Sequence, residues 1–212
     1  MHDIRDFGKG KNKTVDSAPY GGGAGMVISV EPVHKCLLSI ESEVGSDNYK
    51  KAKVVLMGAD GAPYKQKTAN NFARIEHLVL ICGHYKGIDE RILNYIDEKL
   101  SIGDYVLTGG ELAAMIVVDS VARLLPGVVS DFESVSTDSH YEGLLGASCY
   151  TRPEEYDGHR VPKVLLEGNH KLIDEYRFMD SVEKTMKTRP DLYESYEFSK
   201  LELKLIKNNK SK

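Results

Sequence analysis

The chain has 212 residues, of which 41% are hydrophobic, so it can form one domain, or one domain and a small appendage, with a core of ordinary size. Its 28 Lys and Arg against 32 Asp and Glu give a net charge of −4. This mild acidity neither indicates nor excludes a nucleic-acid partner, because a local basic patch decides that. The scattered cysteines Cys36, Cys82 and Cys149 lack zinc-ligand spacing and are typical of reduced thiols in a cytoplasmic protein. No apolar run reaches membrane-spanning length, and no signal-peptide core is present.

The first part of the chain is irregular and ends in a glycine cluster at 20–26. The stretch after Pro32 predicts a helix that continues to Val44. Two short apolar runs, 52–57 and 77–82, are each followed by glycine and predict buried strands.

Three further elements are predicted before the middle of the chain. The charged stretch 87–100 predicts a short helix, and 104–107 predicts a third strand. The run 111–125 predicts a helix that Pro126 and Gly127 stop. The apolar side of this helix is predicted to include Leu112, Met115, Ile116, Val118 and Ala122.

Apolar strands that alternate with helices indicate an α/β fold with a parallel sheet covered on both faces. Such sheets bind ligands at the carboxyl ends of their strands. Glycine-containing loops follow the predicted strands at 57–62, 82–91 and 107–112. Because neither a catalytic serine triad nor a zinc-protease motif is present, these loops favour a site for a small polar cofactor that carries the chemistry. Each glycine could also serve only the geometry of its turn.

The second part of the chain has a different character. Residues 128–158 are rich in Gly, Ser, Asp and Thr without helical or strand period, which predicts a linker or an active-site loop. The chain is then predicted to be helical to its end. Two charged residues stand out: Arg123, late in an apolar helix, and Asp138, in the irregular segment. Taken alone, each is more typical of a surface charge or a turn cap than of a catalytic residue.

Six motifs occur in order: KTVDSAPYGGGAGM, CGHYKGIDER, SIGDYVLTGGELAAM, DSVARLLPGVV, EGLL followed by YTRPE, and VPKVLLEGNH. Together they resemble the bacterial tRNA (guanine-N1)-methyltransferases, trefoil-knot (SPOUT) enzymes that methylate guanosine 37 beside the anticodon. The resemblance covers nearly the whole chain.

This resemblance implies a trefoil-knotted, parallel-sheet methyltransferase domain at 1–128, a linker and active-site loop at 129–160, and a small helical, tRNA-binding C-terminal domain at 161–212. It also implies a cytoplasmic homodimer with composite active sites that binds tRNA and no membrane. The family's usual first strand and helix precede the motif with which this chain begins, so the resemblance leads us to expect a first domain without that strand.

The site residues follow from the same resemblance, position by position. Asp138 matches the general base and Arg123 the arginine that steadies the guanine. Asp16 and Gly25 match positions near the tRNA, as do Asn169 and His170. The residues expected to bind S-adenosylmethionine are Gly83, Tyr85, Ile102, Gly103, Asp104, Tyr105, Val106, Leu107, Gly109 and Gly110.

The sequence departs from the family at three positions near the expected cofactor. Lys86 replaces a glutamate, which reverses a charge and argues against the Mg²⁺ ion that the family is thought to use. His84 replaces an arginine, and Ala59 replaces a proline. A truncated, catalytically impaired relative that binds only tRNA or its partner subunit is therefore an alternative. A nucleotide-dependent oxidoreductase is a third hypothesis, but the glycine fingerprint for it is missing.

Overall fold

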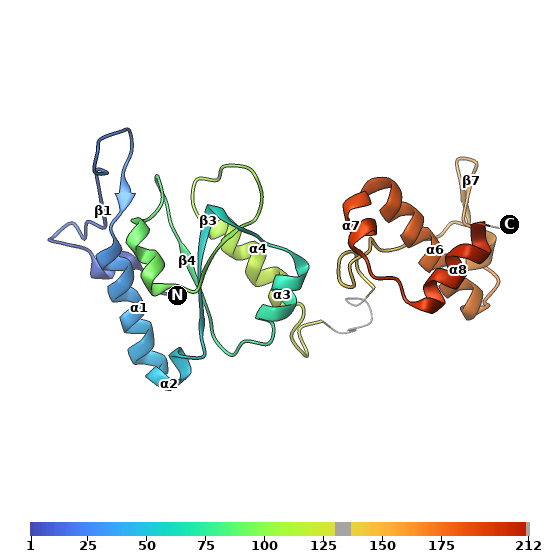
Figure 1. The fold of residues 1–212 in the computed structure, drawn as a ribbon, viewed down its shortest axis with the longest axis horizontal. Helices are drawn as coiled ribbons and strands as arrows, with labels where there is room; N and C mark the ends of the chain where they lie inside the picture. The colour runs from blue at the N-terminus through green and yellow to red at the C-terminus, as the bar shows by residue number, and fades with distance from the viewer. Residues whose placement is uncertain (130–136, 211–212) are drawn as a thin grey trace. The chain divides into compact units, whose positions relative to one another are not determined.

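A computed structural model describes residues 1–129 and 137–210. The chain divides into two compact units, Met1–Ser130 and Asp131–Lys212 (Figure 1). Among the helices of the described residues, none combines the length and the apolar character that crossing a membrane requires.

The first unit is built on a parallel sheet of three strands in the order β4-β3-β5. β3 (Lys53–Pro63) lies in the centre, with β4 (Leu78–Cys82) on one side and β5 (Glu98–Ser101) on the other. Val55 of β3 pairs with both neighbouring strands: with Leu80 of β4 on one side and with Glu98 of β5 on the other. Only a strand that is apolar on both faces suits this central position, and residues 54–57 of β3 are all buried.

Helices cover both faces of this sheet (Figure 1). Val54 and Leu56 pack in a core cluster with α1 (Val30–Val44) and the 3₁₀ helix η2 (Glu90–Tyr95). Val55 and Met57 point to the other face, because side chains alternate along a strand, and pack with α3 (Gln66–Phe72) and α4 (Glu111–Ala122). The predicted parallel sheet with two covered faces is thereby confirmed. Four short elements lie in the irregular and connecting parts of the unit: the 3₁₀ helix η1 (Ile4–Phe7), the antiparallel pair β1 (Asp16–Ser17) and β2 (Val27–Ile28), and α2 (Ser46–Tyr49).

The predicted third strand at 104–107 is wrong. The third strand is β5, which lies at the end of the stretch 87–100 that was expected to be a helix. Only Glu90–Tyr95 of that stretch is helical, and it forms a 3₁₀ helix. Residues 104–107 are instead an exposed loop, in which Val106 is 93% accessible. β5 forms a strand despite its charged residues because its backbone pairs with β3, and such pairing outweighs the low local hydrophobicity of its sequence.

The predicted helix at 111–125 is present as α4, but the apolar side named from the sequence is not the side that packs on the sheet. Ala113, Ala114 and Val117 of α4 are buried against the sheet. The larger apolar residues of the predicted apolar side, Leu112, Met115, Ile116 and Val118, are exposed. The helix is apolar around most of its circumference, so periodicity could not identify the face that contacts the sheet.

The second unit is mostly helical. It contains a small hairpin, β6 (Glu155–Tyr156) and β7 (His159–Arg160), and the 3₁₀ helix η3 (Lys163–Leu165). The helices α6 (His170–Thr188), α7 (Pro190–Ser195) and α8 (Lys200–Lys210) follow.

The described part of the expected linker, 137–160, is held against α6 by hydrogen bonds. The backbone N–H of Leu145 donates to Oγ1 of the buried Thr185 at 2.9 Å, and Ser181 Oγ donates to the Leu145 carbonyl at 2.6 Å. The Ser148 N–H donates to the Asp180 carboxylate at 2.6 Å. This part of the segment therefore belongs to the second unit.

Candidate active site

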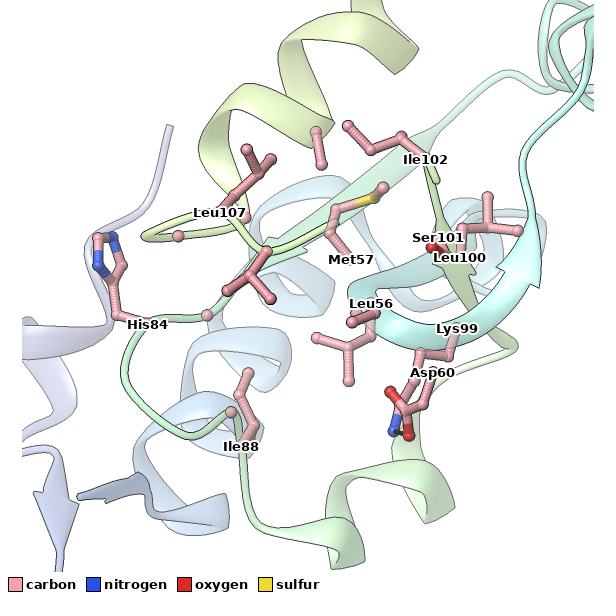
Figure 2. Close-up of a pocket in the computed structure, with 18 of the residues that line it drawn as sticks. Leu56, Met57, Asp60, His84, Ile88, Lys99, Leu100, Ser101, Ile102 and Leu107 are labelled. Carbon is pink, nitrogen blue, oxygen red and sulfur yellow. Dashed lines mark hydrogen bonds and ion pairs between the residues drawn. The ribbon is translucent and has the colours of Figure 1, made fainter. Parts of the chain in front are cut away.

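A cavity of about 470 Å³ lies at the carboxyl end of the sheet in the first unit (Figure 2). Its walls come from residues within three stretches, 56–60, 83–90 and 99–113, which overlap the glycine-containing loops singled out from the sequence. Its volume is within the range of about 300–1,000 Å³ that is typical of small-molecule sites. The carboxyl ends of the parallel strands thus bring the three loops to one cavity.

The loop that follows β5 crosses the sheet edge and returns to the end of β4. The N–H of Gly110 donates to the carbonyl of Gly83 at 2.9 Å, and His84 pairs with Gly109 as an antiparallel bridge. A Cβ on Gly110 would lie 2.9 Å from the Cα of Cys82, closer than real Cβ atoms come. Glycine is therefore required where the start of α4 meets β4.

A side-chain pair at the rim joins the same two loops. His84 Nε2 lies 2.7 Å from Glu111 Oε1, the carboxylate in the first turn of α4. A Cβ on Gly109 would meet this pair, with His84 Nε2 only 2.6 Å away. The pair therefore lies directly against the glycine turn of the cavity wall.

Apolar side chains and glycine backbone make up most of the wall. Figure 2 shows Leu56, Met57, Ile88, Ile102 and Leu107 around the cavity. Such walls suit the flat apolar faces of an adenine ring, and glycine allows a ligand to approach backbone donors and acceptors closely. The residues present therefore fit a cofactor with an adenosine group.

Charged side chains occupy one corner of the cavity (Figure 2). Lys99 Nζ of β5 lies 2.8 Å from Asp60 Oδ2 and 3.6 Å from Glu90 Oε2. Burial alone lowers the pKa of Lys99, but the hydrogen bond and the charge of Asp60, with the charge of Glu90, raise it above its ordinary value. The hydrogen bond from Lys99 lowers the pKa of Asp60. The ammonium group of Lys99 therefore lies between two carboxylates at this corner.

β3 shifts register beside this corner. Both Met57 and Ala62 pair with Leu100, so the residues between them bulge out of the ladder. A Cβ on Gly61 would lie 2.5 Å from backbone atoms of Leu100, so only glycine fits where the strand returns. The bulge places the Asp60 side chain within ion-pair distance of Lys99. Sequence reasoning treated this stretch as a loop and missed both the returning strand and the ion pair.

Most of the residues expected to bind the cofactor line this cavity. They are Gly83, Tyr85, Ile102, Gly103, Tyr105, Val106, Leu107, Gly109 and Gly110. Asp104 is not among the lining residues. The expectation did not include Leu56, Met57, Ile88 and Ala113. Leu56 and Met57 lie at the end of an apolar strand and Ile88 lies in one of the glycine-containing loops, so the sequence offered a signal for these three.

The expected catalytic residues lie in different units. Arg123 directly follows α4 in the first unit, and Asp138 lies in the second unit. Neither lines the cavity described above. The structure of each unit by itself does not bring these two side chains together.

The expected tRNA-side residues are also divided between the units. Asp16 lies in β1 and pairs with Ile28 of β2. Gly25 has a φ of 91°, and its position is packed against the side chain of the cavity residue Lys86. Asn169 caps α6 by accepting a hydrogen bond from the Leu172 N–H at 3.4 Å, and His170 is the first residue of that helix.

The fold and the cavity define an α/β protein with a cavity among glycine-containing loops at the carboxyl edge of a parallel sheet, the place where such folds bind small ligands. The sequence matches the family tRNA (guanine-1)-methyltransferase TrmD over residues 1–195. The chain is 50% identical over 196 residues to a tRNA (guanine-N(1)-)-methyltransferase of Lachnospira eligens, a match that spans 92% of this chain and 81% of the relative. A protein of the same name from Enterococcus faecalis is 47% identical over 210 residues, 99% of this chain and 84% of the relative. A third, from Clostridium beijerinckii, is 44% identical over 209 residues, 99% of this chain and 85% of the relative.

The chain belongs to the tRNA (guanine-1)-methyltransferase TrmD family. Membership in a methyltransferase family of this kind implies S-adenosylmethionine as the methyl donor. Within residues 1–129 and 137–210, no group of three or more His, Cys, Asp or Glu side chains is arranged to hold a metal ion.

Proposed function

We propose that this chain transfers a methyl group from S-adenosylmethionine to N1 of guanosine 37 in tRNA. The observation that carries the proposal is the cavity formed by three glycine loops in a chain that matches the methyltransferase family over residues 1–195. The 50% sequence identity to a tRNA (guanine-N(1)-)-methyltransferase of Lachnospira eligens supports the same substrate.

The cofactor is held by the walls of this cavity. Gly83 and Tyr85 form one wall, and the loop from Ile102 to Gly110 forms another. When bound, S-adenosylmethionine supplies a methyl group on a positively charged sulfur, which leaves with the electron pair of the methyl–sulfur bond. The glycines let backbone groups reach the adenine, and the apolar side chains exclude water from it.

Asp138 and Arg123 act on the guanine. N1 of guanine carries a proton at neutral pH, so a base has to remove that proton as N1 bonds to the methyl carbon. Asp138 takes the proton on its carboxylate, and the electron pair of the N–H bond is freed for attack. The negative charge that develops toward guanine O6 is stabilised by the guanidinium of Arg123.

The tRNA contacts extend over both parts of the chain. Asp16 and Gly25 act on the tRNA from the first domain, residues 1–128, and Asn169 and His170 from the helical domain, residues 161–212. The segment 129–160 joins the two and contributes Asp138. The packing of Gly25 against the cavity residue Lys86 supports a tRNA position beside the cofactor.

The chain acts as a homodimer with a trefoil knot and composite active sites. The loop that leaves β5 on one side of β3 and returns to β4 on the other supports the knot. The exposed apolar side chains of α4, above all Met115 at 65% and Val118 at 55%, support a subunit interface on that helix. In such a dimer the cofactor loop of one subunit meets Asp138 of its partner.

The reaction takes place in the cytoplasm, where tRNA is modified. Lys86 lines the cavity where the family usually has a glutamate, so a Mg²⁺ ion would meet a like charge there. We expect this chain to need Mg²⁺ only for the fold of its tRNA.

The test is methyl transfer to matched tRNA transcripts that differ only at position 37. With guanosine 37, methyl groups should be incorporated at N1; with adenosine 37, incorporation should be absent. Equal incorporation into both would contradict the assigned target. Calorimetric titration with S-adenosylmethionine tests the alternative of an impaired relative, since a silent titration would favour that alternative.

A further inference from the structure

A second cavity, of about 860 Å³, lies within the helical unit. One wall is the irregular stretch 147–154, and the other comes from η3 and α6. Its floor is apolar and partly buried, made by Val161, Leu165 and Ile173. None of these positions is among the site residues expected from the family resemblance.

The wall formed by 147–154 is fixed to α6 at two points. The Ser148 N–H donates to Asp180 at 2.6 Å. Tyr150 hydrogen-bonds to Tyr176 of α6, and burial together with this bond raises the pKa of Tyr176 to about 12. Tyr150 lines the cavity and is 48% exposed, so it is accessible to a ligand while its segment is held against α6.

Two guanidinium groups face this cavity. Arg177 lies one helical turn after Ile173 on α6, so both residues share a face, and Arg152 comes from the opposite wall. Within the described residues, neither arginine forms an ion pair, whereas Arg160 and Arg189 in the same unit are each paired with a carboxylate. The one acidic residue among those lining the cavity is Glu154. The lining therefore carries a positive charge.

We propose that this second cavity is a binding subsite for one nucleotide of the tRNA other than the methylated guanosine. This inference rests on the proposed tRNA substrate. Guanidinium groups bind phosphate with two parallel hydrogen bonds and stack on bases, and an apolar floor beside an exposed tyrosine suits a base. Proteins recognise RNA chiefly at single-stranded loops, where unstacked bases can enter such pockets. Guanosine 37 lies in a loop of this kind.

The experiment measures binding of an unmodified tRNA transcript by fluorescence anisotropy. Arg152→Gln and Arg177→Gln should each weaken binding about tenfold, as expected for loss of a charge-assisted contact. Each should also reduce the slope of log affinity against log salt by about 0.7. The matched control is Arg160→Gln, which removes the same charge from the same unit at a side chain paired with Glu155 and outside the cavity.

A second pair of variants separates a nucleotide site from a general anion site. Tyr150→Ala should weaken tRNA binding severalfold but leave binding of heparin unchanged, because stacking needs a base. Tyr156→Ala, at a tyrosine that is 76% exposed and outside the cavity, is the control. Equal effects of Arg152→Gln, Arg177→Gln and Arg160→Gln on tRNA binding would overturn the subsite, as would equal losses for tRNA and heparin in Tyr150→Ala.

The subsite and the proposed function can fail separately. A wild-type protein that shows this pattern of tRNA binding but transfers no methyl group would support the subsite and contradict the function. Normal methyl transfer by the wild type, together with tRNA affinity unaffected by Arg152→Gln and Arg177→Gln, would support the function and contradict the subsite. Affinity for S-adenosylmethionine should be unchanged in all these variants, since its cavity lies in the first unit.

Discussion

Asp138 is the residue on which the proposed chemistry depends most directly. It lies outside the cofactor cavity, in the second unit, so its removal should affect proton transfer and not cofactor binding. Arg123 also lies outside that cavity, at the end of α4. Effects on methyl transfer and effects on cofactor binding can therefore be measured separately in variants of these two residues.

We predict that Asp138→Asn lowers the rate of methyl transfer by at least about 100-fold, the usual effect of losing a general base. An amide keeps the size of the carboxylate but does not accept the N1 proton. The dissociation constant for S-adenosylmethionine, measured by calorimetry, should stay unchanged. Asp157→Asn, in the turn between β6 and β7, is the matched control. If Asp138→Asn retained most of its turnover, Asp138 would not be the base.

At the scale of single elements, β3 and β5 hold the charged corner of the cofactor cavity. We predict that Asp60→Asn lowers the melting temperature modestly at pH 7, because the Asp60 side chain is 71% exposed and such pairs contribute only about 0.2–1 kcal/mol. The pKa of Asp60 is lowered from 3.8, so the stabilisation is present above 3.8 and is lost as the pH falls through the lower folded value. Thermal melts across this range check the prediction.

The difference in melting temperature between wild type and Asp60→Asn should therefore be constant near neutrality and shrink in acid. Asp47→Asn, whose side chain is 97% exposed, serves as the control and should have little effect at pH 7. A difference that persists unchanged well below pH 3.8 would show that Asp60 acts through packing and not through its charge.

The outward face of α4 carries a second prediction at this scale. Met115→Lys should convert the proposed dimer to a monomer, because a charge would have to be buried in an apolar interface. Light scattering on the eluted protein measures the mass directly. Leu93→Lys, at an exposed apolar residue of η2, is the control and should leave the mass unchanged. A Met115→Lys protein of unchanged mass would exclude this face as the interface.

The elements show why part of the fold could be predicted from the sequence. The runs that form β3 and β4 are apolar on both faces and are bounded by glycine, so local pattern identifies them. The third strand could not be found in this way: β5 contains Glu98 and Lys99, whose places are set by β3 and by the bulge at Asp60. Residues 104–107 resemble a strand because Tyr105 and Val106 have high β propensity, yet without a pairing partner they form an exposed loop. Sequence pattern could not separate the inward from the outward side of α4 either, because this helix is apolar around most of its circumference.

The whole molecule combines residues of two units in one proposed site. We predict that two inactive variants rescue each other when co-expressed. Gly110→Val should disrupt the cofactor loop, because its Cβ would already lie 2.9 Å from the Cα of Cys82, and Asp138→Ala removes the base. Random mixing makes half of the dimers heterodimers, each with one intact composite site, so about a quarter of all sites should be active.

The measurement is methyl transfer by heterodimers purified through two different tags. Each variant expressed alone is the control and should be inactive. Purified heterodimers without activity above either control would refute a site shared between subunits.

The return of the loop 102–110 to β4 has a consequence for the order of folding. The contacts that close the cofactor cavity join β3 to β5 and Gly83 to Gly110, all distant in the chain. Forming such contacts costs loop-closure entropy before they contribute to stability, so we expect them to form late in folding. A ligand that needs the closed cavity binds the native chain and not the transition state for folding. S-adenosylmethionine at 100 times its dissociation constant should therefore stabilise the protein by about 2.7 kcal/mol and act by slowing unfolding, with the refolding rate unchanged.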